Sequence, residues 1–285
     1  MFLPEVLLGF FILMNKQETK VEETLQEPER DFVKIKQEIR DRVGKLLIES
    51  GVIRPDPIFH LSLEHYITDF EGNELATERL INLPEWQKAK RIFITPDRST
   101  QLLREKAIIE RKEIVVTTYG ICRGAVLLTR DIVPEDQEAF AASLDGMERF
   151  GNPLRTIKEI QKAGKIDLMV TGALAISEGH GGRTGKGAGW FDAEWIMWRK
   201  MGLTTPKTPV IGIVHDLQVV PESFPLQQWD TIAQIIVTPT RIIRVSPRQQ
   251  PDQVYWQQMD TDWMKAIPLM IELYQQENFG TLTAK

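Results

Sequence analysis

The residues best suited to chemistry lie in a glycine-rich segment in the second half of the chain. Its glycines are Gly179, Gly181, Gly182, Gly185, Gly187 and Gly189. Glycine permits the unusual backbone dihedrals and the close backbone approach that a phosphate-binding loop requires. Arg183 and Lys186 add positive charge within the segment, and a guanidinium can bind a phosphate through two hydrogen bonds. Asp192 follows the glycines with the oxygen ligands that Mg²⁺ prefers, so the pattern predicts a site for a nucleotide and its metal ion.

A buried strand and a helix are expected on either side of this segment. The apolar run Asp167–Thr171 predicts the strand, and the periodicity of Phe191–Met201 predicts the helix. The start of such a helix offers unpaired N–H groups and a partial positive charge to an anion. Two common motifs do not fit: Gly187 follows Lys186 where a P-loop has Ser or Thr, and Trp190 stands where a dinucleotide fingerprint has glycine. A flexible surface loop remains the alternative.

The rest of the chain alternates between short apolar runs and helical patterns. Strands are expected at Arg91–Thr95, Glu113–Thr118, Val210–Val214 and Gln234–Thr238, and helices at Ser99–Arg111, Asn152–Ala163 and Trp263–Gln275, the last with a kink at Pro268. The stretches 55–84 and 247–252 are expected to form loops. Strands without alternating polar residues indicate burial on both faces and a mostly parallel sheet. Alternation of strands and helices predicts an α/β layered fold.

The first predicted helix carries two cations close to its apolar face. Apolar residues at helical spacing mark this helix from Asp31 to Gly51. On a helical wheel Lys36 falls within the apolar stripe and Arg40 at its edge. A lysine in a buried stripe is unusual, so Lys36 either meets a ligand or extends its ammonium group to the surface.

Composition indicates a globular cytoplasmic protein. The 285 residues are 42% hydrophobic and 26% charged, and the net charge of -5 argues against a general nucleic-acid-binding protein. The one cysteine, Cys122, cannot form an internal disulfide, which is typical of a reducing compartment. The apolar start, Met1–Met14, lacks a basic region and a cleavage site and is shorter than a membrane span. We therefore expect a disordered or misassigned tail over residues 1–30, one domain over 31–285, no membrane partner, and a monomer or weak homo-oligomer.

The segment Gly182–Asp192 resembles the nucleotide and folate loop of the 5-formyltetrahydrofolate cyclo-ligases, also called methenyltetrahydrofolate synthetases. In that family an arginine precedes a glycine-rich loop that ends in two tyrosines and an aspartate. Here Trp190 and Phe191 replace the tyrosines, which keeps the aromatic surface but removes both hydroxyls. Further similar segments are His215–Val220, Trp229–Asp230 and Ile236–Thr240. Pro96–Asp97 with Arg104 is closer to the longer branch described as methenyltetrahydrofolate synthetase domain-containing, and the resemblance covers Lys34 to Arg244.

The resemblance implies a three-layer α/β/α fold with a mostly parallel sheet, like that of the isomerase and CoA-transferase superfamily. It also implies an enzyme that uses ATP and Mg²⁺ to convert its partner, the reduced folate 5-formyltetrahydrofolate, to 5,10-methenyltetrahydrofolate. The residues implied for phosphate binding are Lys36, Arg40, Arg183, Gly185, Lys186, Gly187, Ala188 and Gly189. Of these, Arg183 and Lys186 would be catalytic. The implied metal ligands are Asp192 and Asp230, and the implied substrate contacts are Trp190, Phe191 and Gln218.

Other interpretations stay open on the sequence alone. The missing tyrosine hydroxyls favour a nucleotide- or folate-binding regulator without turnover. An ATP-dependent enzyme of the same fold with another substrate is a further alternative, because the residues that would contact folate match the family least. Trp190 and Phe191 could stack on a pterin ring or pack against the sheet. His215 could orient the substrate or be structural.

Overall fold

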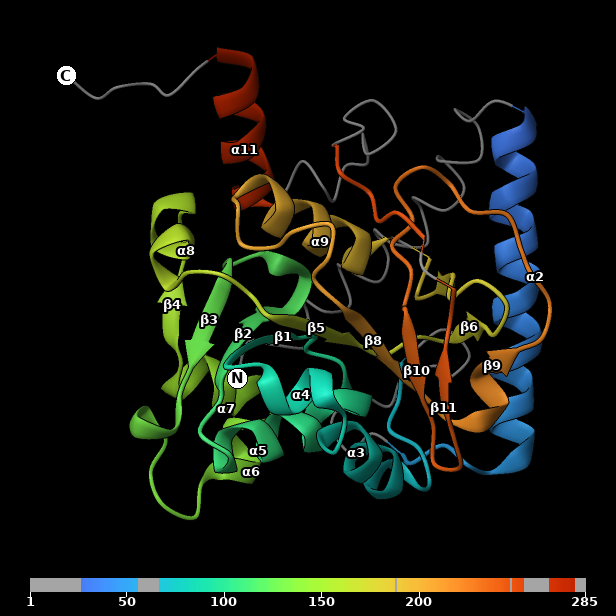
Figure 1. Ribbon diagram of the computed structural model, residues 1–285, viewed down its shortest axis with the longest axis horizontal. Helices are drawn as coiled ribbons and strands as arrows, with labels where there is room; N and C mark the ends of the chain where they lie inside the picture. The colour runs from blue at the N-terminus through green and yellow to red at the C-terminus, as the bar shows by residue number, and fades with distance from the viewer. Residues whose placement is uncertain (1–26, 56–66, 188, 247, 254–266, 280–285) are drawn as a thin grey trace.

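The computed structural model describes residues 27–55, 67–187, 189–246, 248–253 and 267–279 (Figure 1). The strands of its central sheet are β1 (Arg91–Ile94), β2 (Glu113–Thr117), β3 (Ala125–Leu128), β4 (Asn152–Leu154), β5 (Leu168–Thr171), β8 (Val210–Ile213), β10 (Ile235–Val237) and β11 (Ile242–Arg244). Their order in space is β11-β10-β8-β5-β1-β2-β3-β4. Neighbouring strands from β10 to β2 run parallel, whereas β11, β3 and β4 pair antiparallel at the two edges. The predicted mostly parallel sheet is confirmed.

The helices form a layer on each face of this sheet (Figure 1). One layer consists of α3 (Asn73–Ile81), α4 (Pro84–Lys88), α5 (Gln101–Ile109), α6 (Glu138–Ala141) and α7 (Leu144–Phe150). The other consists of α8 (Ile157–Ala163), α9 (Trp190–Lys200) and α11 (Pro268–Phe279). The three-layer α/β/α prediction is therefore confirmed. None of the helices within the described ranges combines the length and the apolar character needed to cross a bilayer.

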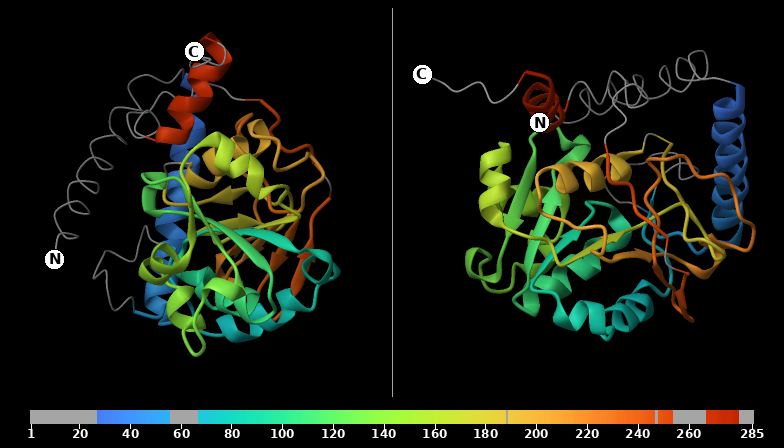
Figure 2. Two further views of the ribbon diagram at one scale, coloured as in Figure 1. Left: turned by 90° about the vertical axis from the view of Figure 1, so that its left-hand side faces the viewer. Right: turned by 45° about the horizontal axis from the view of Figure 1, so that its top comes forward.

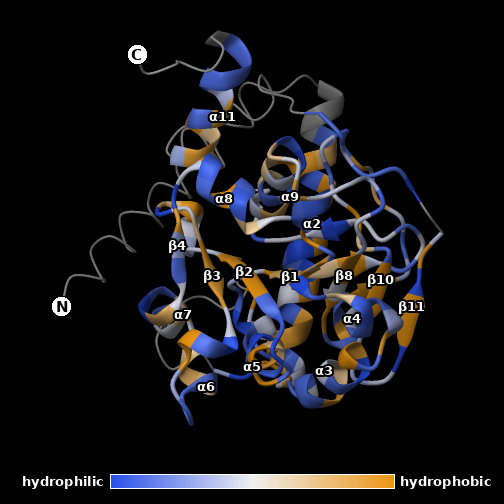
Figure 3. Cartoon of the chain, turned by 60° about the vertical axis from the view of Figure 1, so that its left-hand side comes forward, coloured by the Kyte–Doolittle hydropathy of each residue, from blue (hydrophilic) through white to orange (hydrophobic). Residues whose placement is uncertain are grey.

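The central strands are apolar on both sides because helices cover both faces. In β1, Phe93 belongs to the core under α8, α9 and α11, whereas Ile92 and Ile94 belong to the core under α3 to α7. This alternation follows from the pleat, which points successive side chains to opposite faces. Figure 3 shows hydrophobic colour on strands such as β10, whereas the surrounding helices carry both hydrophobic and hydrophilic stretches.

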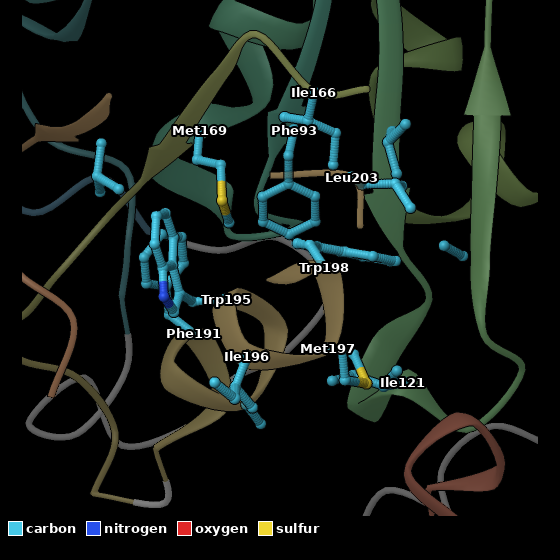
Figure 4. Packing of buried hydrophobic residues seen from close by; sticks show 14 of the residues in the cluster. Phe93, Ile121, Ile166, Met169, Phe191, Trp195, Ile196, Met197, Trp198 and Leu203 are labelled. Atoms are coloured by element: carbon cyan, nitrogen blue, oxygen red, sulfur yellow. The ribbon is translucent and has the colours of Figure 1, made fainter. Parts of the chain in front are cut away.

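The helix α9, which follows the glycine-rich segment, is anchored by large aromatic side chains. Trp195 and Trp198 are fully buried, and the ring of Trp198 lies 5.6 Å from the ring of Phe93 in β1 (Figure 4). Trp195 also donates a hydrogen bond from its indole nitrogen to the carbonyl of Pro251 at 2.7 Å. Aromatic burial of this kind dominates core energetics and fixes the position of the helix.

A second, smaller sheet lies between the central sheet and the first helix. It consists of β7 (Arg183–Thr184), β6 (Ala175–Ser177) and β9 (Val219–Val220), in that order. The helix α2 (Glu27–Ser50) stands beside β6 and β9 at one end of the molecule (Figures 1 and 2). Its apolar stripe packs on the small sheet, through Ile39, Val43 and Leu47. The predicted amphipathic helix is confirmed, but it begins at Glu27, ahead of Asp31; residues 1–26 of the predicted tail lie outside the described residues.

The helix predicted over Asn152–Ala163 is wrong in its first part. Residues Asn152–Leu154 form the edge strand β4, and helix α8 begins only at Ile157. Proline has no amide donor, so Pro153 is tolerated at the sheet edge but would disrupt a helix interior. Thr156 then caps the helix by accepting a hydrogen bond from the amide of Glu159 at 3.2 Å.

Two further expectations about loops and kinks are corrected. The stretch 55–84 was expected to be a loop, but it contains α3, whose buried Ala76 and Leu80 lie one helical turn apart. Pro268 begins α11 and does not kink it, because the first turn of a helix tolerates proline. Residues 263–266 of the predicted closing helix lie outside the described residues.

Candidate functional site

The glycines of the predicted phosphate loop fall into two structural groups. The strand predicted at Asp167–Thr171 is β5, but the strands β6 and β7 intervene before α9, and Gly179, Gly181 and Gly182 form the connection between them. Gly181 has a φ of +70°, and a Cβ there would lie 2.2 Å from the carbonyl oxygen of Ala233. This glycine is therefore required by the packing of two backbone segments. The sequence-based prediction placed it in the phosphate loop.

The second group, Gly185, Gly187 and Gly189, forms the loop from β7 to α9. A Cβ at Gly185 would meet no atom within 4 Å, so its surroundings are open. Gly187 has a φ of +101°, and Gly189 caps α9 with a φ of 70°. These are left-handed conformations that favour glycine. The loop delivers an open backbone to the start of an 11-residue helix, as a phosphate site requires; Ala188 lies outside the described residues.

Each of three predicted phosphate-binding cations is paired with a carboxylate. Arg183 Nη2 lies 3.0 Å from Asp192 Oδ1. The Lys36 ammonium contacts Asp230, 194 residues away in sequence. Lys186 Nζ lies 3.3 Å from Asp97 Oδ1. The three cations come from α2, from β7 and from the loop after β7. Their carboxylate partners come from α9, from the segment after β1 and from the segment before β10.

Arg183 is held by several contacts besides its ion pair. Its side chain is buried, its Nε donates to the carbonyl of Thr231 at 3.1 Å, and its guanidinium carbon lies 4.2 Å from the centre of the Phe191 ring. Stacking on an aromatic face and a fixed set of donors pre-organise a guanidinium for planar, two-point recognition. The amide of Thr231 also donates to Asp192 at 2.8 Å, so the acid that Arg183 meets is fixed as well.

Asp192 and Asp230 come together although nothing in local sequence joins them. Burial raises the pKa of the Asp192 carboxyl, Arg183 opposes that rise, and the negative charge of Asp230 adds to it. Asp230 is held by the amide of Gln227 at 2.7 Å. Within the described ranges there is no group of three or more His, Cys, Asp and Glu side chains placed to hold a metal. Two carboxylates suit Mg²⁺, which binds few protein groups and keeps several waters.

The two predicted residues of the first helix both face the protein interior. Lys36 is 8% exposed and Arg40 is 6% exposed. Lys36 therefore does not extend its ammonium to the surface. Its charge is compensated by Asp230, as a buried cation requires. Arg40 Nε donates to Gln37 Oε1 at 2.9 Å, within the same helix.

The predicted substrate residues are placed in different ways. Phe191 is buried, with its ring 6.3 Å from that of Phe93, so it packs in the core. Trp190 is half-buried at the start of α9. Gln218 is buried, and its amide is used by the backbone: Oε1 accepts from the amide of His215 and Nε2 donates to the carbonyl of Ala173, both at 2.7 Å. The geometry gives Phe191 and Gln218 structural roles.

Two acids of the site were not assigned from the sequence. One is Asp97, the partner of Lys186. The other is Glu194, which is buried in α9 and accepts a hydrogen bond from Thr117 Oγ1 at the end of β2. Burial raises the pKa of Glu194 from 4.5 to about 8, and the nearby negative charge of Asp97 adds to the rise. The sequence does contain a signal for Glu194: it is an ionisable residue one helical turn from Trp198, within the apolar face of the predicted helix.

Comparison with known proteins gives a consistent result over most of the chain. The sequence profile of the 5-formyltetrahydrofolate cyclo-ligase family matches residues 33–239. Proteins described as methenyltetrahydrofolate synthase domain-containing are similar over 251 residues, with 29% identity in Homo sapiens and 30% in Bos taurus. The matches cover 85% of this chain but only 62% of each relative, so the chain spans less than two thirds of their length.

Two solved structures are also similar at low identity. One is the NMR structure of the Aquifex aeolicus 5,10-methenyltetrahydrofolate synthetase, with 17% identity and a TM-score of 0.46 over 78% of this chain and 98% of that one. The other is a 5,10-methenyltetrahydrofolate synthetase from Mycoplasma pneumoniae, with 14% identity and a TM-score of 0.41. The latter match covers 72% of this chain and 98% of the Mycoplasma protein.

Proposed function

The chain belongs to the 5-formyltetrahydrofolate cyclo-ligase family, and we propose that it converts 5-formyltetrahydrofolate to 5,10-methenyltetrahydrofolate with ATP and Mg²⁺. The observation that carries this proposal is the gathering of three cations near the start of α9. Arg183 contacts Asp192 in the first turn of α9, Lys36 contacts Asp230, whose charge acts on Asp192, and Lys186 lies in the open glycine loop before the helix. These groups match the negative charge of a triphosphate. We place the reaction in the cytoplasm, in keeping with the single cysteine of the chain.

The proposed chemistry asks the protein mainly for positioning. The formyl oxygen attacks the γ-phosphorus, and the bond from that phosphorus to the ADP oxygen breaks. The neighbouring folate nitrogen, which does not carry the formyl group, then attacks the activated formyl carbon and loses its proton. Inorganic phosphate leaves as the five-membered ring closes. Phosphoryl transfer of this kind is accelerated by alignment of the reacting groups and neutralisation of charge.

The residues divide this work by their position. Arg183 lies in β7 and Lys186 in the glycine loop that follows it, and both would hold the transferred phosphate. Lys36 and Arg40 approach from α2 and would hold the remaining phosphates. Asp192 and Asp230 would hold Mg²⁺, which when bound supplies positive charge to the phosphate oxygens.

One observation supports a second candidate function, a nucleotide- or folate-binding regulator without turnover. The positions where the family has two tyrosines hold Trp190 and Phe191, and Phe191 is packed in the core. No hydroxyl is therefore available at either position to hydrogen-bond a substrate. This candidate keeps the nucleotide site but lacks the folate reaction, and an ATP-dependent enzyme with another substrate would share the same features.

The deciding experiment measures formation of 5,10-methenyltetrahydrofolate by its near-ultraviolet absorbance. Purified protein is mixed with 5-formyltetrahydrofolate, with and without ATP and with and without Mg²⁺. The proposal expects product only when both are present, and a large loss of rate in Lys186→Met. ATP binding without product under any of these conditions would favour the regulator or another substrate. Product formed without ATP would contradict the proposed chemistry.

A further inference from the structure

Asp97 lies where the end of a central strand meets the glycine loop. It follows β1, whereas Lys186 lies in the loop between β7 and α9. Lys186 Nζ and Asp97 Oδ1 are 3.3 Å apart, and their side chains are only 20% and 12% exposed. Ligands of open α/β sheets bind outside the carboxyl ends of the strands, which is the edge where Asp97 lies.

The backbone around Lys186 gives little restraint to its side chain. It stands between Gly185, whose surroundings are open, and Gly187, which has a φ of +101°. A lysine side chain has a flexible four-carbon stem and loses considerable rotamer entropy when it is fixed. Its position must therefore come from what the ammonium group contacts, and Asp97 is such a contact.

Asp97 is itself fixed from behind by a buried arginine. Arg104 in α5 is 1% exposed, and its guanidinium donates to the carbonyls of Asp97 at 3.1 Å and Ala142 at 2.8 Å. It also donates to the carbonyl of Thr95 and to the hydroxyl of Thr100. These bonds tie the segment after β1 to α5 and to the loop before α7. Asp97 thus stands on a rigid base.

The neighbouring acid, Glu194, forms its side-chain hydrogen bond with Thr117. It is 3% exposed and accepts a hydrogen bond from Thr117 at the end of β2. Asp97, by contrast, directs its carboxylate to the glycine loop and is in ion-pair contact with Lys186. The two acids therefore have different roles although they lie close together.

From this geometry we propose that Asp97 is a positioning residue for Lys186, holding its ammonium group at the place where the transferred phosphate enters. Arg104 supports Asp97 in this role. The inference rests on the proposed phosphoryl transfer, because it assigns Lys186 to the phosphate. Its consequence is specific: loss of Asp97 releases Lys186 and does not remove a group that binds the nucleotide.

The test compares Asp97→Asn with Asp97→Glu, Arg104→Lys and a matched control, Glu85→Gln. Glu85 forms an ion pair with Arg244 at 2.7 Å on the edge strand β11, so the control also removes an ion-paired carboxylate. For each protein kcat and the KM for ATP are measured, together with the acetylation rate of Lys186 in the ligand-free protein by peptide mass spectrometry. Denaturant unfolding reports whether the fold is kept.

For Asp97→Asn we expect kcat to fall by about tenfold to a hundredfold, the range for a misplaced catalytic group, while the KM for ATP does not rise. Acetylation of Lys186 should rise about fivefold, as expected for loss of one ion pair. Asp97→Glu should recover part of kcat, Arg104→Lys should lower kcat in the same direction, and Glu85→Gln should match the wild type. An unchanged kcat, or a higher KM for ATP, overturns the inference.

Failure of the proposed function gives a different result. If the wild type forms no methenyltetrahydrofolate, the proposed reaction is wrong, and Lys186 acetylation with calorimetric ATP binding then decides the role of Asp97. Faster acetylation in Asp97→Asn with undiminished ATP affinity supports the positioning role. Unchanged acetylation, or lost ATP affinity in a folded variant, overturns it.

Discussion

The substitution Glu194→Gln removes an unusual titrating group from the protein interior. Glu194 is 3% exposed, and burial raises the pKa of its carboxyl from 4.5 to about 8. A glutamine has nearly the same shape and can still accept the hydrogen bond from Thr117 Oγ1. The change therefore isolates the effect of the proton from the effect of packing.

The sign and size of that effect follow from the pKa values in the folded and unfolded chains. Below pH 4.5 the Glu194 carboxyl is protonated in both the folded and the unfolded chain, so its titration does not lower the free energy of unfolding. Between 4.5 and about 8 only the unfolded chain releases the proton, and stability falls by about 1.36 kcal/mol per pH unit. The difference between 4.5 and about 8 corresponds to about 5 kcal/mol, a large part of the ordinary stability of a domain.

The assay is urea unfolding of the wild type and Glu194→Gln at a series of pH values from 4.5 to 9. Groups other than Glu194 titrate in both proteins and cancel in the difference. We expect the variant to gain in relative stability as pH rises and the difference to level off above about 8. A difference that stays constant across this range would show that Glu194 is ionised in the folded protein, and the reasoning from burial would be refuted.

Three further predictions concern the proposed nucleotide site. Asp192→Asn and Asp230→Asn should each raise the Mg²⁺ concentration needed for ATP binding in a Mg²⁺ titration. If both side chains hold one ion, the loss of binding free energy in the double variant should be smaller than the sum of the two single losses. Additive losses would contradict a shared ion. Gly187→Val should weaken ATP binding more than about tenfold, because the φ of +101° at this position strains a β-branched residue. Calorimetry measures the affinity and circular dichroism checks the fold, and an affinity equal to that of the wild type would place the phosphates elsewhere. In denaturant titrations Lys36→Met should lower the free energy of unfolding by about 3 kcal/mol, because it leaves the Asp230 carboxylate buried without a cation. Adding Asp230→Asn should recover part of that loss. If the single variant is as stable as the wild type, the Asp230 carboxylate does not need Lys36.

Burial along single elements could be predicted from the sequence because it depends on local periodicity. The stripe of α2 that contains Lys36 follows from a repeat of about 3.6 residues. The strands at Arg91 and Glu113 were placed at their first residues, because compact apolar runs are typical of buried strands. These features require no knowledge of what lies opposite each element.

The elements that sequence patterns missed are short or depend on distant partners. The strands β6 and β7 have three and two residues, too few for a period to be visible, and their pairing gives Gly179 to Gly182 a structural purpose. The contact of Lys36 with Asp230 joins residues 194 positions apart. The contact of Lys186 with Asp97 depends equally on the order of strands in the sheet. The residue types were visible in advance, but only the fold joins them in pairs.

The pairing itself constrains how the proposed ligands bind. Lys36, Arg183 and Lys186 each contact a carboxylate. A triphosphate that drew Lys36 and Arg183 away from Asp230 and Asp192 would leave two buried carboxylates without compensation, which is strongly unfavourable. A divalent ion on Asp192 and Asp230 would restore the balance, since it would replace the charges that Arg183 and Lys36 supplied. In the proposed site phosphate and metal would therefore stabilise one another, because either one alone would leave a buried charge unpaired.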